Sequence, residues 1–101
     1  MDVRETLVRM LNQLVEDMQA IHQQGAGYYS CVPFARRYNK LLGQAVLLFP
    51  DGAGGLIGTF EEWPEKDAKD PGEKYATVQG IRLEVGQLIA LLKSVKEEDK
   101  Q

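Results

Sequence analysis

The chain holds one histidine and one cysteine among its 101 residues. These two side chains are often used as bases, nucleophiles and metal ligands. His22 and Cys31 stand nine positions apart, which matches no metal-ligand spacing. A reactive Cys31 is one alternative, because it precedes an expected helix and a helix N-terminus lowers a thiol pKa. A small, partly buried thiol is the simpler interpretation. We therefore predict no enzyme activity, no metal and no cofactor.

Three cations stand close to an aromatic side chain further along. Arg36, Arg37 and Lys40 flank Tyr38, and cations beside an aromatic ring can hold phosphate and stack a base. Tyr38 falls on the apolar face of its expected helix, however, and three cations on a chain of net charge −3 give only weak, salt-sensitive binding. We predict that the three cations bind a partner, with nucleic acid disfavoured. A regulator that binds a small ligand or nucleic acid at this face is the alternative function.

Two neighbouring tyrosines are further candidates for partner binding. Tyr28 and Tyr29 lie in an expected connection, and neighbours in an extended chain point in opposite directions, so one of them is expected at the surface. A glycine-rich stretch, residues 51–55, lacks the lysine and hydroxyl of a phosphate-binding loop, so we interpret it as a turn.

The elements that carry these residues are three expected helices. Residues 2–24 place apolar side chains at helical spacing over a broad face, and glycines follow directly. That face includes Val3 and Met10 beside a regular seam of Leu7, Leu11, Leu14, Met18 and Ile21. Residues 33–49 form the second helix, opened by a proline and ended by Pro50. A β-hairpin across residues 45–60 is the competing interpretation, because two apolar runs flank the glycine-rich stretch.

The third helix, residues 71–96, carries the longest seam. Asp70 is placed to cap its start, with Pro71 and Glu73 in the first turn. Seam residues follow at spacings of three and four: Val78, Ile81, Val85, Leu88, Leu92 and Val95. Gly80 and Gly86 lie off this seam and either admit a close neighbour or face solvent.

Between the second and third helices, residues 50–70 are expected to form a surface loop that Phe60 and Trp63 anchor on the helices. Residues 51–74 hold seven acids and three bases, a balance of −4, whereas residues 25–50 hold three bases and no acid. These oppositely charged segments attract each other or a partner. Residues 97–101 are wholly polar and are expected to fray.

These patterns predict an all-α, single-domain protein of three helices in an antiparallel arrangement. The apolar face of the first helix is wider than one neighbour would cover, so we predict a homodimer that completes a helical bundle. One cysteine allows no internal disulfide, acidic residues near the N-terminus oppose a signal peptide, and no apolar run is long enough to span a membrane. The expected location is therefore cytoplasmic. The expected function is a non-enzymatic protein–protein interaction or accessory, regulatory module.

Overall fold

The computed structural model describes residues 3–23, 30–49, 55–67 and 69–95. It contains the helices α1 (Val3–Gln23), α2 (Val32–Leu48) and α3 (Pro71–Val95), with a short 3₁₀ helix, η1 (Ile57–Thr59). No strand occurs among the described residues, which confirms the all-α prediction, and the helix bounds differ from the expected ones by at most one residue. Several predictions fall outside the described residues: those for Tyr28, Tyr29, the helix-ending glycines, residues 51–54 and the tail 97–101.

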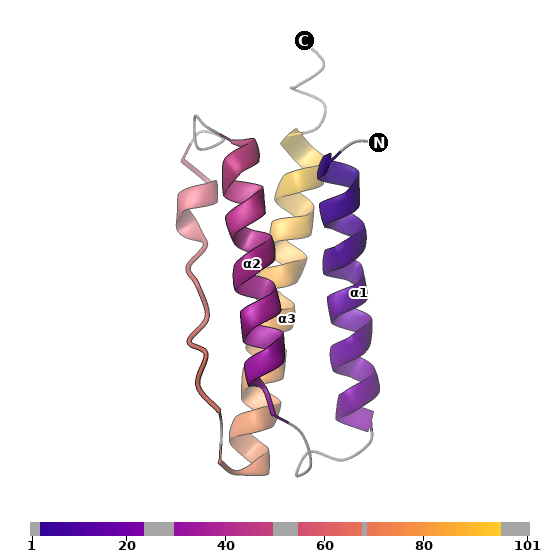
Figure 1. Cartoon of the computed structure of the whole chain (residues 1–101), viewed down its shortest axis with the longest axis vertical. Coiled ribbons are helices and arrows are strands. Elements are labelled where there is room, and N and C mark those ends of the chain that lie inside the picture. The colour runs from indigo at the N-terminus through magenta and orange to yellow at the C-terminus, as the bar shows by residue number, and fades with distance from the viewer. Residues whose placement is uncertain (1–2, 24–29, 50–54, 68, 96–101) are drawn as a thin grey trace.

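The three helices pack pairwise into a bundle of 48 × 23 × 16 Å. Figure 1 shows α1 running antiparallel to both other helices, as predicted, while α2 and α3 run in the same direction. The two helices are parallel because residues 55–67, which we call the strap, return along the length of the bundle before α3 begins (Figure 1). None of the helices in the described ranges is long and apolar enough to cross a membrane.

The core lies along the predicted seams. The five seam residues of α3 with described side chains, from Val78 to Leu92, are each at most 1% exposed. Leu7, Leu11, Leu14 and Met18 of α1 are buried against them. Full burial of such a side chain contributes about 1.5–3 kcal/mol relative to exposure, which outweighs the roughly 1 kcal/mol that each helical glycine costs.

The start of α3 is capped as the sequence predicts. The Asp70 Oδ1 atom accepts a hydrogen bond from the Glu73 backbone N–H at 2.8 Å, and the Glu73 carboxylate accepts one from the Lys69 N–H at 3.2 Å. Pro71 occupies the first helical position, where its missing N–H is not needed. Two backbone donors that the helix cannot satisfy internally are thus satisfied locally.

The helix interpretation of residues 45–49 is confirmed over the hairpin. The helix α2 continues through Leu48 and ends at the buried Phe49, and the next described residues form a turn at Gly55 and then η1. Gly55 has a φ of +90°, a conformation that L side chains rarely adopt, so glycine is required where the strap begins.

Figure 1 shows the strap running alongside α2. Phe60 and Trp63 anchor it on the core, as predicted, and Trp63 contacts both α2 and α3. The Asn39 side chain accepts a hydrogen bond from the Trp63 N–H at 2.7 Å and donates one to the Trp63 carbonyl at 2.8 Å. The Trp63 indole covers Gly80 so closely that a Cβ atom there would collide with the ring. Gly80 therefore admits an indole from the strap rather than another helix, while a Cβ at Gly86 would meet open space.

Candidate functional site

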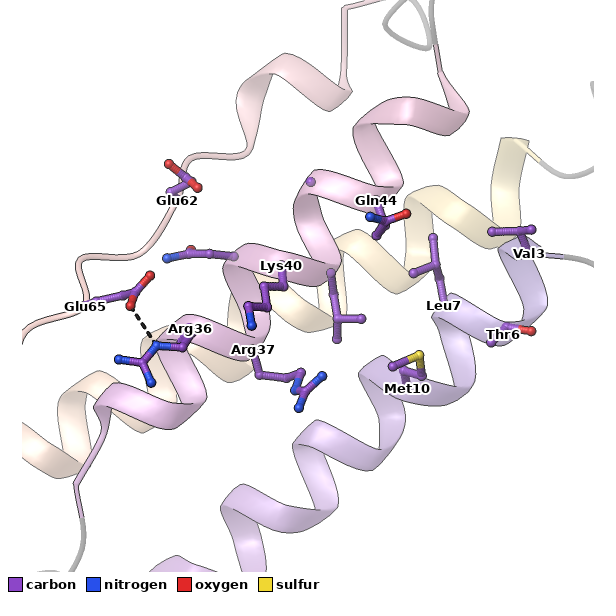
Figure 2. Close-up of a pocket in the computed structure, with 13 residues that line it drawn as sticks. Val3, Thr6, Leu7, Met10, Arg36, Arg37, Lys40, Gln44, Glu62 and Glu65 are labelled. Atoms are coloured by element: carbon purple, nitrogen blue, oxygen red, sulfur yellow. Dashed lines mark hydrogen bonds and ion pairs between the residues drawn. The ribbon is translucent and has the colours of Figure 1, made fainter.

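A hollow of about 650 Å³ crosses the outer face of α2, from α1 on one side to Glu62 and Glu65 of the strap on the other. We call its α1 side, between α1 and α2, the α1–α2 groove. Its floor includes the buried side chains of Leu7 and Leu41. Val3 and Met10 lie on α1 at the edge of the groove and are 57% and 41% exposed, respectively. Figure 2 shows Met10 and Leu7 on α1 facing Arg37, Lys40 and Gln44 on α2. The groove thus combines exposed apolar side chains, which typically form the centre of a protein interface, with cations, which belong to its polar rim.

The structure separates the three predicted cations. Arg36 points towards the strap, where its Nε atom lies 3.0 Å from a Glu65 carboxylate oxygen (Figure 2). Both side chains are about half exposed, so water screens the pair and it contributes roughly 0–1 kcal/mol. The predicted attraction between the acidic and basic segments therefore occurs within the chain at this pair.

Arg37 and Lys40 lie on the α1 side of the same helix (Figure 2). Both are exposed, and no carboxylate among the described residues forms an ion pair with either. Asp17 lines the next hollow along the groove with Met10 and Arg37, and its carboxylate accepts a hydrogen bond from Gln13 at 2.9 Å. Two cations thus stand available to an anionic partner beside Met10.

Tyr38 is fully buried between the helices, so its ring does not reach the surface to stack a base. Its hydroxyl has no hydrogen-bond partner among the described residues. Burial, together with the charge of Glu84, raises the Tyr38 pKa to about 12. The aromatic side chain nearest the cations is therefore part of the core and not of the groove.

Two groove residues differ from the sequence expectation. Val3 and Met10 were expected on the apolar face that packs against the other helices, yet both are more exposed than the seam residues around them. The regular spacing of the α1 seam includes Leu7 and Leu11, and Val3 and Met10 lie to one side of that seam. That departure from the regular spacing is the signal in the sequence that marks them as surface residues.

The structure opposes a reactive Cys31. The thiol is buried and lies 3.7 Å from the Lys74 carbonyl oxygen, to which it donates. Burial, and then the charge of Asp67, raises the Cys31 pKa, with Lys74 acting in the opposite direction. The Cys31 backbone N–H also donates to Asp67 at 3.3 Å, so the residue fastens the end of the strap to the start of α2.

His22 lies near the end of α1, as expected, and stacks at a tilt on Tyr75 with ring centroids 4.9 Å apart. No three His, Cys, Asp or Glu side chains gather as metal ligands in the part of the chain that the structure describes. Comparisons of the chain with protein-family models, curated proteins and solved structures gave no match.

Proposed function

We propose that this protein is a non-enzymatic interaction module, with an accessory or regulatory role in the cytoplasm, and that the α1–α2 groove binds its protein partner. One observation carries the proposal: Arg37 and Lys40, without ion-pair partners among the described residues, stand beside the exposed Val3 and Met10 in one hollow. Apolar side chains supply affinity when they are desolvated, and cations at the rim select the partner by charge.

The test is affinity capture from native lysate with matched charge reversals. The variant Arg37→Glu/Lys40→Glu changes the groove, while Lys66→Glu/Lys69→Glu makes the same charge change at two exposed positions outside it. The proposal predicts a protein that is retained by the wild type and the control and lost by the groove variant. Equal retention by both variants would contradict it.

We also propose that the chain forms a homodimer through a second surface, the face between α1 and α3. Both neighbours of α1 pack on its broad apolar face, so the width of that face needs no second chain. The support is instead Leu83, 66% exposed, close to the half-buried Val15 and Ile89, with open space at Gly86. A two-fold axis would bring two such faces together.

Light scattering after size exclusion tests this part of the proposal over a range of concentration. We expect a dimer mass that survives dilution and that Leu83→Glu reduces to a monomer mass. Leu47→Glu is the control, because Leu47 is 72% exposed at the end of α2 and away from this face. A stable wild-type monomer at tens of micromolar would reject the homodimer and leave the groove proposal standing.

A further inference from the structure

We propose that the partner segment in the α1–α2 groove is an acidic peptide with apolar anchors, the same chemistry that the strap shows on the other flank of α2. This inference rests on the proposed function, because it specifies what the groove binds. It starts from a feature of α2: the helix carries three cations and no acidic residue between Val32 and Leu48.

The strap shows how this chain covers a flank of α2. Its apolar residues Phe60 and Trp63 pack on the core, and Glu65 pairs with Arg36 at 3.0 Å. The strap main chain is fixed by the two hydrogen bonds between Asn39 and Trp63. A segment that combines aromatic side chains with carboxylates therefore matches this helix in both burial and charge.

The α1–α2 groove offers the same combination, and the strap borders the hollow only on the other side of α2, at Glu62 and Glu65. Arg37 and Lys40 supply the positive charge that Arg36 supplies on the strap side. The exposed Val3 and Met10 supply an apolar surface comparable to the one that the strap's aromatic side chains cover. Burying apolar surface contributes about 25 cal/mol per Å², and carboxylates at the two cations would add charge-assisted hydrogen bonds. Three cations and two carboxylates line the whole hollow, and Glu65 pairs with Arg36, so the excess positive charge lies on the α1 side of α2, at Arg37 and Lys40. Charge complementarity therefore favours an acidic partner on that side.

The geometry also limits the size of the segment. Arg37 and Lys40 are three residues apart on a helix, a rise of about 4.5 Å, and Arg37 to Gln44 spans roughly 10 Å. An extended peptide rises about 3.3 Å per residue. Two carboxylates within one or two positions of each other, next to an apolar side chain, therefore suit the groove, and about four extended residues span it.

Peptide selection on the full-length protein tests the inference. A displayed library of random peptides of about twelve residues is selected on the wild type and counter-selected on Arg37→Glu/Lys40→Glu. Enriched peptides are then measured in solution against the wild type, this variant and the control Lys66→Glu/Lys69→Glu. Circular dichroism verifies that each variant is folded, and Met10→Ser, a neutral change at an exposed groove position, supplies a second groove variant.

We expect enriched peptides with net negative charge and at least one aromatic or large aliphatic residue. Their binding should weaken about tenfold or more in the charge-reversed groove variant, should change less than about twofold in the control, and should fall as salt rises. Met10→Ser should weaken the same peptides, because the apolar anchor loses its contact.

The outcomes separate the inference from the proposed function. Neutral or basic peptides that depend on the groove variants would overturn the acidic assignment and leave the groove as a binding surface. Enrichment without any dependence on the groove variants, or no enrichment at all, would reject both. Preferential binding of single-stranded DNA, displacing the peptides, would replace the acidic peptide with nucleic acid as the ligand.

Discussion

The two flanks of α2 carry similar side chains but differ in whether another segment of the chain contacts them. On one flank, Glu65 of the strap pairs with the half-exposed Arg36, and Trp63 of the strap covers Gly80. On the other flank, Arg37 and Lys40 stand beside exposed apolar side chains of α1. Arg36 and Arg37 are adjacent in the sequence, yet a segment that begins near Gly55 satisfies one and leaves the other for a partner. The comparison shows that availability of a charged residue is decided by tertiary cover rather than by its local sequence.

The largest effect should come from removing the indole that fastens the covered flank. Trp63→Ala should lower the free energy of unfolding by about 2–4 kcal/mol, because the ring packs on the core and fills the space over Gly80. Met10→Ala on the open flank should change it by less than about 0.5 kcal/mol, since a single exposed side chain is lost. Urea unfolding followed by circular dichroism measures both. Equal losses would mean that the two flanks do not differ in structural role.

The two glycines of α3 sharpen the comparison, because the same substitution should act with opposite sign. Gly80→Ala should destabilise the protein by about 1–3 kcal/mol, because the new Cβ would displace the indole of Trp63. Gly86→Ala meets open space and should stabilise it by roughly 0.5–1 kcal/mol through helix propensity. Thermal unfolding of both variants checks the signs. A stabilising Gly80→Ala would show that the strap is not seated on α3.

Asn39 holds the strap main chain from α2, and Gln44 is its counterpart on the open flank. Asn39→Ala removes both hydrogen bonds to Trp63 and should cost about 1–2 kcal/mol. It should also speed alkylation of the buried Cys31, whose N–H bonds to the strap at Asp67. Gln44→Ala should leave stability and alkylation rate unchanged, because Gln44 is exposed. An unaltered alkylation rate in Asn39→Ala would show that the accessibility of Cys31 does not depend on how the strap is held.

Tyr38 lies on the core side of α2, between the two flanks, and should give the smallest effect at neutral pH. Tyr38→Phe should be neutral or stabilising by up to about 1 kcal/mol, because it removes a buried hydroxyl with no described partner. The folded-state pKa is raised to about 12 by burial. The stability linked to the neutral phenol is therefore fully present below about pH 10, the ordinary tyrosine value, and is lost as pH rises towards the folded-state pKa.

Denaturant unfolding between neutral and alkaline pH tests the Tyr38 prediction. The wild type should lose stability more steeply than Tyr38→Phe above the ordinary tyrosine pKa. Parallel curves would indicate that the hydroxyl reaches a partner or solvent in the folded protein.

The helices and their contact faces were predictable from the sequence, whereas the cover of α2 was not. Spacing alone located the seam from Val78 to Leu92, and Asp70 with Pro71 located the start of α3, because local propensity and periodicity act over a few residues. The seating of Trp63 on Gly80 depends on the path of a segment with no periodicity.

The candidate site was predicted in part. The sequence identified Arg37 and Lys40 as surface cations but grouped them with Arg36 and assigned Met10 to the packed face. A pattern of spacings shows which side chains share a face of a helix. How much of that face the neighbouring helices cover depends on the angle at which the helices cross. This is why the exposure of Met10 emerges only from the assembled bundle.

Photo-crosslinking in native lysate tests most directly whether the open flank binds a partner and the covered flank is structural. A benzophenone amino acid replaces Met10 in the open groove or Gln87, which is exposed on α3 beside the strap. We expect an adduct with another protein from position 10 that Arg37→Glu/Lys40→Glu abolishes, and none from position 87. An adduct from position 87 alone, or one from position 10 that survives the charge reversal, would contradict this expectation.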